Sequence, residues 1–290
     1  MKKSVARSNL TEESAPPAQS LPRSGNLKRR LAGGEVSVGS WLQLAHPAHA
    51  EIMADAGFEW LVIDLEHSVI TIREAEELVR IAGLSGIVPL VRVSSNDPVQ
   101  IKRVMDAGAG GIVVPMVKTR EEAERAVGAV RYPPTGYRGV GLARAQGYGA
   151  RFDEYCKWLE EESIVIVQIE HIEAVRNLSA IFQVSGVDGF IVGVYDLSGS
   201  LGVPGQFDHP LMRAALAEIK HRAAEHPGII PGFHVVPQRP ELVAEKVAEG
   251  YRLIAYSSDM LLLGEACRSG VRAMKAIGAW GRALPPPARP

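Results

Sequence analysis

The chain has 290 residues, a formal net charge of -1 and 46% hydrophobic residues, a composition typical of a soluble globular protein. Charges of both signs are interspersed, so no basic surface is expected to bind nucleic acid. The two cysteines, Cys156 and Cys267, lie far apart and lack the spacing of metal ligands, which argues against a disulfide framework and a structural zinc site.

The first 30 residues are rich in Ser, Pro and charged residues and nearly lack aromatics, which predicts a disordered N-terminal tail. No signal-peptide core follows Lys2 and Lys3, and no run of about 18 apolar residues occurs later, so we expect a cytoplasmic protein that does not enter a membrane. Residues 31–280 carry one uninterrupted pattern and predict a single domain. The proline-rich residues 281–290 predict a flexible C-terminal tail.

Short apolar segments recur along the domain, and each has the length of a buried strand. They lie at residues 36–44, 59–65, 87–93, 110–115, 164–170, 188–193, 229–235 and 251–257. Nearly all are apolar on both faces, as expected of strands in a parallel sheet that is covered on both sides.

Segments with helical periodicity alternate with these strands, for example at 71–83, 119–130, 209–226 and 239–249. A glycine lies just before several strands and fits a left-handed helix C-cap, namely Gly57, Gly108, Gly186 and Gly250. Eight β-then-α units in one domain predict a (β/α)8 TIM barrel rather than a doubly wound open sheet, because no glycine fingerprint follows the first strand. Residues 131–150 fit neither element and predict a long loop.

Polar residues at the carboxyl ends of the strands are the candidate site residues, because the loops after the strands form the active site of a TIM barrel. The second strand ends in Asp64-Leu65-Glu66-His67, and the third contains Arg92. The fifth ends in Gln168-Ile169-Glu170-His171, and Asp196 follows the sixth. We therefore expect all four groups at one mouth of the barrel.

Two carboxylates on neighbouring strands, Glu170 and Asp196, have the chemistry to hold Mg²⁺ or Mn²⁺. The alternative is that one of them pairs with Arg92 and the other caps a helix. A guanidinium within an apolar strand requires an anion, which is either a protein carboxylate or a ligand oxygen. His67 is a candidate general acid or base because it directly follows a strand end with two acids.

Five segments of the sequence resemble the HpcH/HpaI aldolase family of metal-dependent class II pyruvate aldolases, which includes hydroxy-oxo-heptanedioate aldolases. They are GSWLQLAHPAHAEIMADAGFEWLVIDLEHS, VRVSSNDPVQIKRVMDAGAGGIVVPMV, RGVGLARA, VQIEHIEAVRNL and VDGFIVGVYDLSGSLG. They occur in order over roughly residues 35–265, which makes the resemblance far more specific than any single motif.

The resemblance implies a role for each candidate residue. Glu170 and Asp196 would be the metal ligands, and Gln168 beside them would place water or substrate. Arg92 would hold the keto oxygen of the substrate as it becomes an enolate. His67 would be the catalytic histidine, and Asp106 would fix its tautomer.

Two departures from the family pattern occur near these residues. Val194 and Tyr195 stand where many relatives have a proline and a small residue, beside the backbone that would bind the substrate carboxylate together with Asp196. His171 follows Glu170 where other residue types are frequent, so a role behind the metal ligands stays open for it. Asp64 and Arg144 are further candidates for supporting or substrate-tail contacts.

The resemblance thus predicts an aldolase that uses Mg²⁺, Mn²⁺ or Co²⁺ and cleaves or forms a carbon–carbon bond in a 4-hydroxy-2-oxo acid, giving pyruvate or a close 2-oxo acid plus an aldehyde. The alternatives are a related enolate-forming lyase or oxaloacetate decarboxylase, a Schiff-base aldolase that uses Lys118, and a barrel without catalytic activity. The family also implies a homo-oligomer, either hexamer or dimer, in which subunits exchange a C-terminal helix at about residues 259–277.

Overall fold

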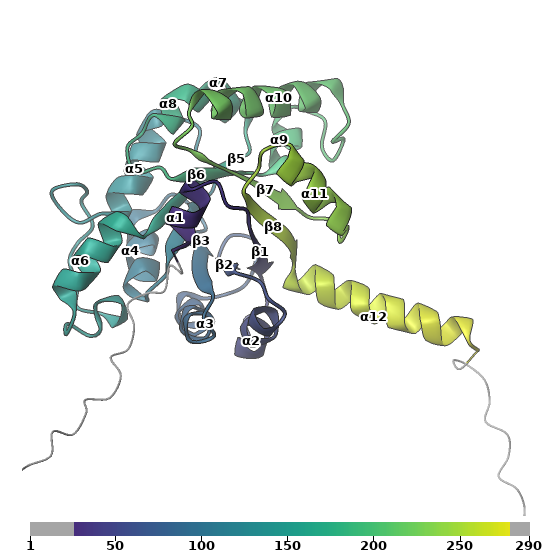
Figure 1. Ribbon diagram of the computed structural model, residues 1–290, viewed down its shortest axis with the longest axis horizontal. Helices are drawn as coiled ribbons and strands as arrows, with labels where there is room; N and C mark the ends of the chain where they lie inside the picture. Colours follow the sequence, from purple (N-terminus) through teal and green to yellow (C-terminus); the bar gives the residue numbers. More distant parts are fainter. Residues whose placement is uncertain (1–25, 279–290) are drawn as a thin grey trace, which may run out of the picture.

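Eight parallel strands pair in chain order and close into a barrel in the computed structural model, which describes residues 26–278 (Figure 1). The strands are β1 (Ser37–Leu42), β2 (Trp60–Asp64), β3 (Val88–Arg92), β4 (Gly111–Val114), β5 (Ile164–Ile169), β6 (Gly189–Val192), β7 (Ile230–Val235) and β8 (Leu253–Ser258). They lie at nearly the predicted bounds, and the predicted TIM barrel is confirmed.

Helices surround the barrel and return the chain from the end of one strand to the start of the next (Figure 1). They are α2 (Pro47–Asp55), α3 (Ile72–Leu84), α4 (Pro98–Asp106), α5 (Arg120–Val130), α6 (Phe152–Glu161), α7 (Ile172–Arg176), α8 (Leu178–Phe182), α9 (Val194–Ser200), α10 (Pro210–Glu225) and α11 (Pro240–Ala248). Capping boxes at Thr71 and Thr119 begin α3 and α5. The glycines at 57, 108, 186 and 250 have φ between 94° and 100°, which confirms the predicted left-handed C-caps.

A short helix, α1 (Leu27–Ala32), closes the amino-terminal end of the barrel. Its Leu27 and Leu31 are buried in the same cluster as Trp60 and Val88, the first residues of β2 and β3. Lys28 Nζ lies 2.7 Å from Asp188 Oδ1, just before β6. The predicted boundary of the tail at residue 30 is therefore wrong, because residues 27–30 belong to this helix. The rest of the predicted tail, and residues 281–290, lie outside the described residues.

The last helix, α12 (Asp259–Ala276), projects away from the barrel instead of packing along it (Figure 1). Ser258 caps its first turn, and Asp259 is its only buried residue. Several large apolar side chains of this helix are exposed, namely Met260, Leu261, Leu263 and Met274. None of the described helices combines the length and the apolar character needed to cross a lipid bilayer.

The predicted loop at 131–150 is irregular except for one 3-10 turn, η1 (Arg144–Gln146). Arg131 and Arg138 of this loop are buried, so the segment is anchored against the barrel by two guanidinium groups.

Candidate active site

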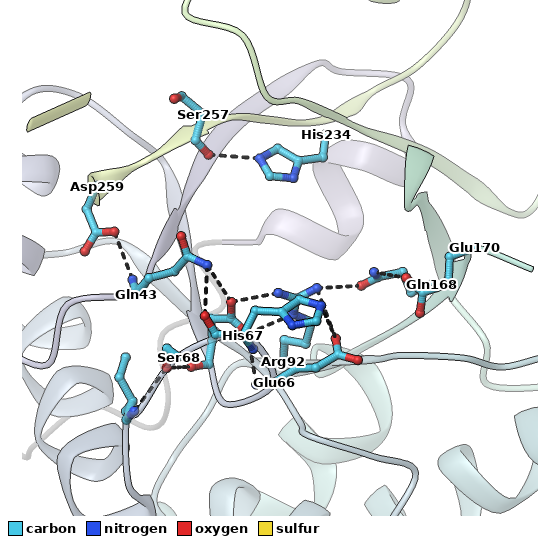
Figure 2. A network of polar contacts seen from close by, with 12 residues as sticks. Gln43, Glu66, His67, Ser68, Arg92, Gln168, Glu170, His234, Ser257 and Asp259 are labelled. Atoms are coloured by element: carbon cyan, nitrogen blue, oxygen red, sulfur yellow. Dashed lines mark hydrogen bonds and ion pairs between the residues drawn. The ribbon is translucent and has the colours of Figure 1, made fainter. Parts of the chain in front are cut away.

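The carboxyl ends of the strands surround a cavity of about 360 Å³. Its walls contain residues of six strands, β1, β3 and β5 to β8, and of the segments that follow β1, β2, β6, β7 and β8. These residues are Trp41, Gln43, His67, Arg92, Gln168, Val192, Gly193, Val194, Tyr195, Asp196, His234, Val236, Ser258 and Leu261. The prediction that the polar strand ends share one mouth is thus confirmed for the second, third, fifth and sixth strands. A close view shows the polar network at this mouth (Figure 2).

Arg92, the last residue of β3, is held by a bidentate ion pair with Asp64, the last residue of β2. Its Nε and Nη2 donate to the two carboxylate oxygens of Asp64 at 2.9 and 2.7 Å. The pair forms because parallel pairing sets Asp64 directly beside Arg92. Burial acts to raise the pKa of Asp64, but the hydrogen bonds and charge of Arg92 outweigh burial and lower that pKa. Arg92 thus pairs with Asp64 and not with Glu170 or Asp196, the two carboxylates considered for it from the sequence.

The second edge of the guanidinium faces a different set of groups. Arg92 Nη1 lies 3.1 Å from Glu66 Oε2 and 3.5 Å from Gln168 Oε1, and the guanidinium carbon lies 4.2 Å from the centre of the Trp41 ring. Because Asp64 and Trp41 fix the plane of the guanidinium, Nη1 is a positioned donor at the cavity wall.

Glu170 directly follows β5, and both of its carboxylate oxygens accept hydrogen bonds. Met116 adopts a left-handed φ of 54° and donates its backbone N–H to Oε1 at 2.7 Å, while Gln168 Nε2 donates to Oε2. Burial raises the pKa of Glu170 to about 7, and the charges of Glu66 and Asp196 act in the same direction. Hydrogen bonds thus hold the Glu170 carboxylate in place, but no lysine or arginine of the described residues forms an ion pair with it.

Glu66 is a site residue to which the sequence analysis assigned no role. Burial raises its pKa to about 7, the charges of Asp64 and Asp196 add to this rise, and Arg92 opposes it. Glu66 lies in the turn directly after β2, where its backbone N–H donates to Asp64 Oδ1 at 3.0 Å. Its place just after a strand end was the signal that could have found it. Together with Glu170 and Asp196 it forms a cluster of three carboxylates, in which the charge of Asp196 raises the pKa of both Glu66 and Glu170.

The turn from β6 into α9 packs against Glu170 because residue 193 is a glycine. A Cβ at Gly193 would lie 2.6 Å from Glu170 Oε2 and 3.1 Å from Gln168 Nε2. This contact brings Val194, Tyr195 and Asp196 to the cavity wall, with Asp196 in the first turn of α9. The tyrosine is exposed and its ring packs edge-on against Phe207, 4.9 Å between ring centres.

His67 lies at the rim of the cavity, where 59% of its side chain is exposed. Its Nε2 is 4.0 Å from Glu66 Oε2, and its backbone N–H donates to Asp64 Oδ1 at 3.2 Å. The neighbouring carboxylates are therefore Glu66 and Asp64.

Asp106 does not lie beside His67 within this chain, so its role at the histidine stays a prediction. It is the last residue of α4, which runs from the carboxyl end of β3 back to the amino end of β4. There its carboxylate pairs with Arg138. Arg144 lies at the same distant end, where Nη1 donates to the carbonyl oxygen of Ala107 at 2.9 Å, so its predicted contact with the site is also absent.

Two further candidates lie beside the site but not in the cavity wall. His171 caps α7, because its Nδ1 accepts the backbone N–H of Glu173 at 3.1 Å. Lys118 Nζ lies 3.9 Å from Glu173 Oε2, and Lys118 is not among the residues that line the cavity.

The donor set at Glu170 and Asp196 fits a hard divalent cation. All the side-chain donors there are oxygens, and buried negative charge raises the pKa of Glu170, which a bound cation would relieve. Among residues 26–278 no group of three or more acids, histidines or cysteines has the arrangement of a complete metal site. One or two carboxylates suffice for Mg²⁺ when water and substrate oxygens complete the shell.

Residues 37–266 match the family described as HpcH/HpaI aldolase/citrate lyase. The 4-hydroxy-2-oxo-heptane-1,7-dioate aldolase of Salmonella typhimurium is 41% identical over 262 residues, which are 88% of this chain and 97% of that protein. The crystal structure of an HpcH/HpaI aldolase from Desulfitobacterium hafniense is similar with a TM-score of 0.80 at 30% identity, over 90% of this chain and 99% of that one. A family protein from Burkholderia cenocepacia is similar with a TM-score of 0.81 at 33% identity, over 86% of this chain and 98% of that one.

Proposed function

The chain belongs to the HpcH/HpaI aldolase/citrate lyase family and is a carbon–carbon lyase, and we propose that its site works as a divalent-metal-dependent class II aldolase on a 4-hydroxy-2-oxo acid. Cleavage breaks the C3–C4 bond, the C4 hydroxyl loses its proton and becomes the aldehyde, and C3 takes up a proton to give pyruvate or a close 2-oxo acid. The observation that carries the proposal is the carboxylate cluster of Glu66, Glu170 and Asp196 beside the fixed guanidinium of Arg92.

We assign the metal to Glu170 and Asp196. Their oxygen ligands favour Mg²⁺ or Mn²⁺, and Co²⁺ is a further candidate. When bound, such an ion supplies the positive charge that stabilises the enolate of a 2-oxo acid. Gln168 orients Glu170 through its amide N–H, and Met116 does so through its backbone.

Arg92 is assigned to the oxygen on which negative charge develops. Its Nη1 faces the cavity, and the bidentate pair with Asp64 keeps it from rotating. A donor that is already in position stabilises this charge without reorganisation during the reaction. The segment from Gly193 to Asp196 is assigned to the substrate carboxylate, because its backbone lines the same wall.

His67 is assigned as the general base in cleavage and the general acid in addition. Its exposed position at the rim lets it exchange a proton with the C4 hydroxyl and with water. Asp64 and Glu66 orient the residue from the protein side.

The test is an assay of pyruvate release from several 4-hydroxy-2-oxo acids after exhaustive chelation and after addition of Mg²⁺, Mn²⁺ or Co²⁺. We expect activity to disappear with the metal and to return with it, and Glu170→Gln to lower kcat by about 100-fold or more. Activity that survives chelation and is trapped by borohydride with substrate would instead identify Lys118 as a Schiff-base lysine. Oxaloacetate as sole substrate measures the alternative decarboxylase activity in the same assay.

We also propose that the protein is a cytoplasmic homo-oligomer. The helix α12 projects from the barrel with Met260, Leu263 and Met274 exposed, and a second copy of the chain would cover them. Light scattering coupled to size exclusion distinguishes hexamer, dimer and monomer, and a monomer at micromolar concentration would contradict this proposal.

A further inference from the structure

One polar side chain in the cavity wall has no role in the reaction described above. We propose that His234, a residue of β7, determines specificity by accepting a hydrogen bond from a hydroxyl group of the aldehyde, so that short hydroxyaldehydes are the preferred aldehyde partners. This inference rests on the proposed aldolase function and specifies its substrate class.

The ring of His234 is held in one tautomer. Its Nε2 lies 3.0 Å from the backbone carbonyl oxygen of Ser257, and a carbonyl only accepts, so Nε2 carries the hydrogen. Ser257 has a left-handed φ of 54° and lies where the register between β8 and β1 shifts. A strained residue at such a shift turns its carbonyl out of the regular ladder, and here it turns toward the histidine. Nδ1 is therefore the nitrogen with the lone pair.

His234 stays neutral at physiological pH. Burial lowers its pKa to about 4, the charge of Arg92 acts in the same direction, and the Ser257 carbonyl opposes both. Nδ1 has no hydrogen-bond partner within the described part of the chain, and His234 lines the cavity. The ring packs against Trp41, with 5.2 Å between ring centres, so its orientation is fixed. The cavity thus contains an unoccupied hydrogen-bond acceptor.

Gln43 adds a second acceptor to the same cavity. Its Nε2 donates to Asp64 Oδ2 at 2.9 Å, which fixes the orientation of the amide. In Figure 2 the amide oxygen of Gln43 points toward the side on which His234 lies. A hydroxyl group can donate to either acceptor, whereas a carboxylate can donate to neither.

The charge of the cavity also disfavours an aldehyde with a distal carboxylate. Arg92 is the only lysine or arginine among the described residues that line the cavity, and Asp64, Glu66 and Gln168 already engage it. The cation assigned to Glu170 and Asp196 is already balanced by these two carboxylates, so a second substrate carboxylate would be buried without a charge partner of its own. Trp41, Val236 and Leu261 provide the apolar wall that a short carbon chain requires.

The experiment compares aldol addition of pyruvate to glycolaldehyde and to propionaldehyde, which have the same number of heavy atoms and differ by one hydroxyl. The full-length protein is loaded with Mn²⁺, and the ratio of the two kcat/KM values is measured for the wild type, His234→Leu and His234→Asn. The two variants are isosteric, both lose the bond to Ser257, and only asparagine keeps an acceptor near the position of Nδ1. We expect His234→Leu to lower the ratio about five- to tenfold, the effect of one hydrogen bond between uncharged groups, and His234→Asn to keep most of it.

Exchange of the pyruvate methyl protons in D₂O, followed by NMR without any aldehyde, separates this inference from the proposed function. No metal-dependent exchange in the wild type would overturn the aldolase proposal itself. If exchange proceeds in all three proteins and both variants keep the wild-type ratio of kcat/KM for glycolaldehyde to that for propionaldehyde, the role of His234 alone is overturned. A wild-type preference for an aldehyde with a terminal carboxylate, such as succinic semialdehyde, would also overturn it.

Discussion

Replacing Gly193 with alanine tests whether the close approach of the β6–α9 turn to Glu170 positions the carboxylate cluster. The added Cβ would lie 2.6 Å from Glu170 Oε2 and 2.7 Å from Glu170 Cβ. Ordinary contacts between such atoms are about 3.5 Å or longer, so Glu170 must move by roughly 1 Å or the turn must withdraw. A displacement of about 1 Å in a catalytic group costs about 100-fold in rate. We therefore expect kcat/KM for pyruvate release to fall by about 100-fold in Gly193→Ala.

A matched control is available on the same helix. Gly199 lies within α9, and a Cβ built there has no atom within 4 Å. Gly199→Ala should leave activity within about twofold and should raise stability by up to about 1 kcal/mol, because alanine is the better helix former. Both variants are assayed for kcat, KM, the concentration of Mg²⁺ at half-maximal activity and the melting temperature. Equal activity of the two variants would refute the reasoning, and so would a loss in Gly193→Ala that is explained by unfolding alone.

The remaining predictions concern charge and proton transfer. The pKa of Glu170 is raised to about 7 in the folded protein, so the metal-free wild type should lose stability relative to Glu170→Gln as pH rises from about 4.5 to about 7. Bound Mg²⁺ should remove this loss. Thermal melts in which the two proteins differ by a constant amount across this pH range would contradict the prediction. A lysine at position 92 cannot form the bidentate pair with Asp64, so Arg92→Lys should lower kcat by about 100-fold or more. Circular dichroism checks that the variant stays folded. An unchanged kcat would mean that a positive charge alone is sufficient for catalysis. His67→Gln should lower kcat by about 100-fold or more without weakening activation by Mn²⁺, and a parallel loss of activation would assign the residue to metal binding instead.

The fold could be predicted from the sequence because its local signals agree with one another. Thr71 with Glu74 forms the capping box that begins α3, and Gly57 and Gly108 take the left-handed conformation that ends the preceding helices. α1 was missed because Leu27 and Leu31 are only two apolar residues in a charged segment. Their burial depends on the open end of the barrel, which is a tertiary feature that no local pattern contains.

The candidate site was predictable where a residue follows a strand, because a closed parallel barrel brings all carboxyl ends to one rim. Asp106 and Arg144 do not follow a strand, so this rule does not place them at the rim. In this chain α4 ends with Asp106 at the opposite end of the barrel, and Arg144 contacts Ala107 there. His234 was missed for a different reason. It lies inside a strand that is apolar on both faces, so the sequence gives no alternation from which to tell an inward from an outward side chain.

The distribution of charge at the mouth connects the metal, the oxo acid and the aldehyde. The one positive charge of Arg92 is shared between Asp64 and Glu66, and among the described residues no lysine or arginine forms an ion pair with Glu170 or Asp196. A 2-oxo acid carries its own carboxylate, so its binding next to these groups is repulsive until a divalent ion is present. His234 lines the same cavity, where Arg92 is the only lysine or arginine among the described residues, which is why we proposed an aldehyde that binds through hydroxyl donors and not through a second carboxylate. The two proposals therefore share one electrostatic basis, a single arginine shared among several acids, from which both a requirement for a cation and a preference for an uncharged, hydroxylated aldehyde are expected.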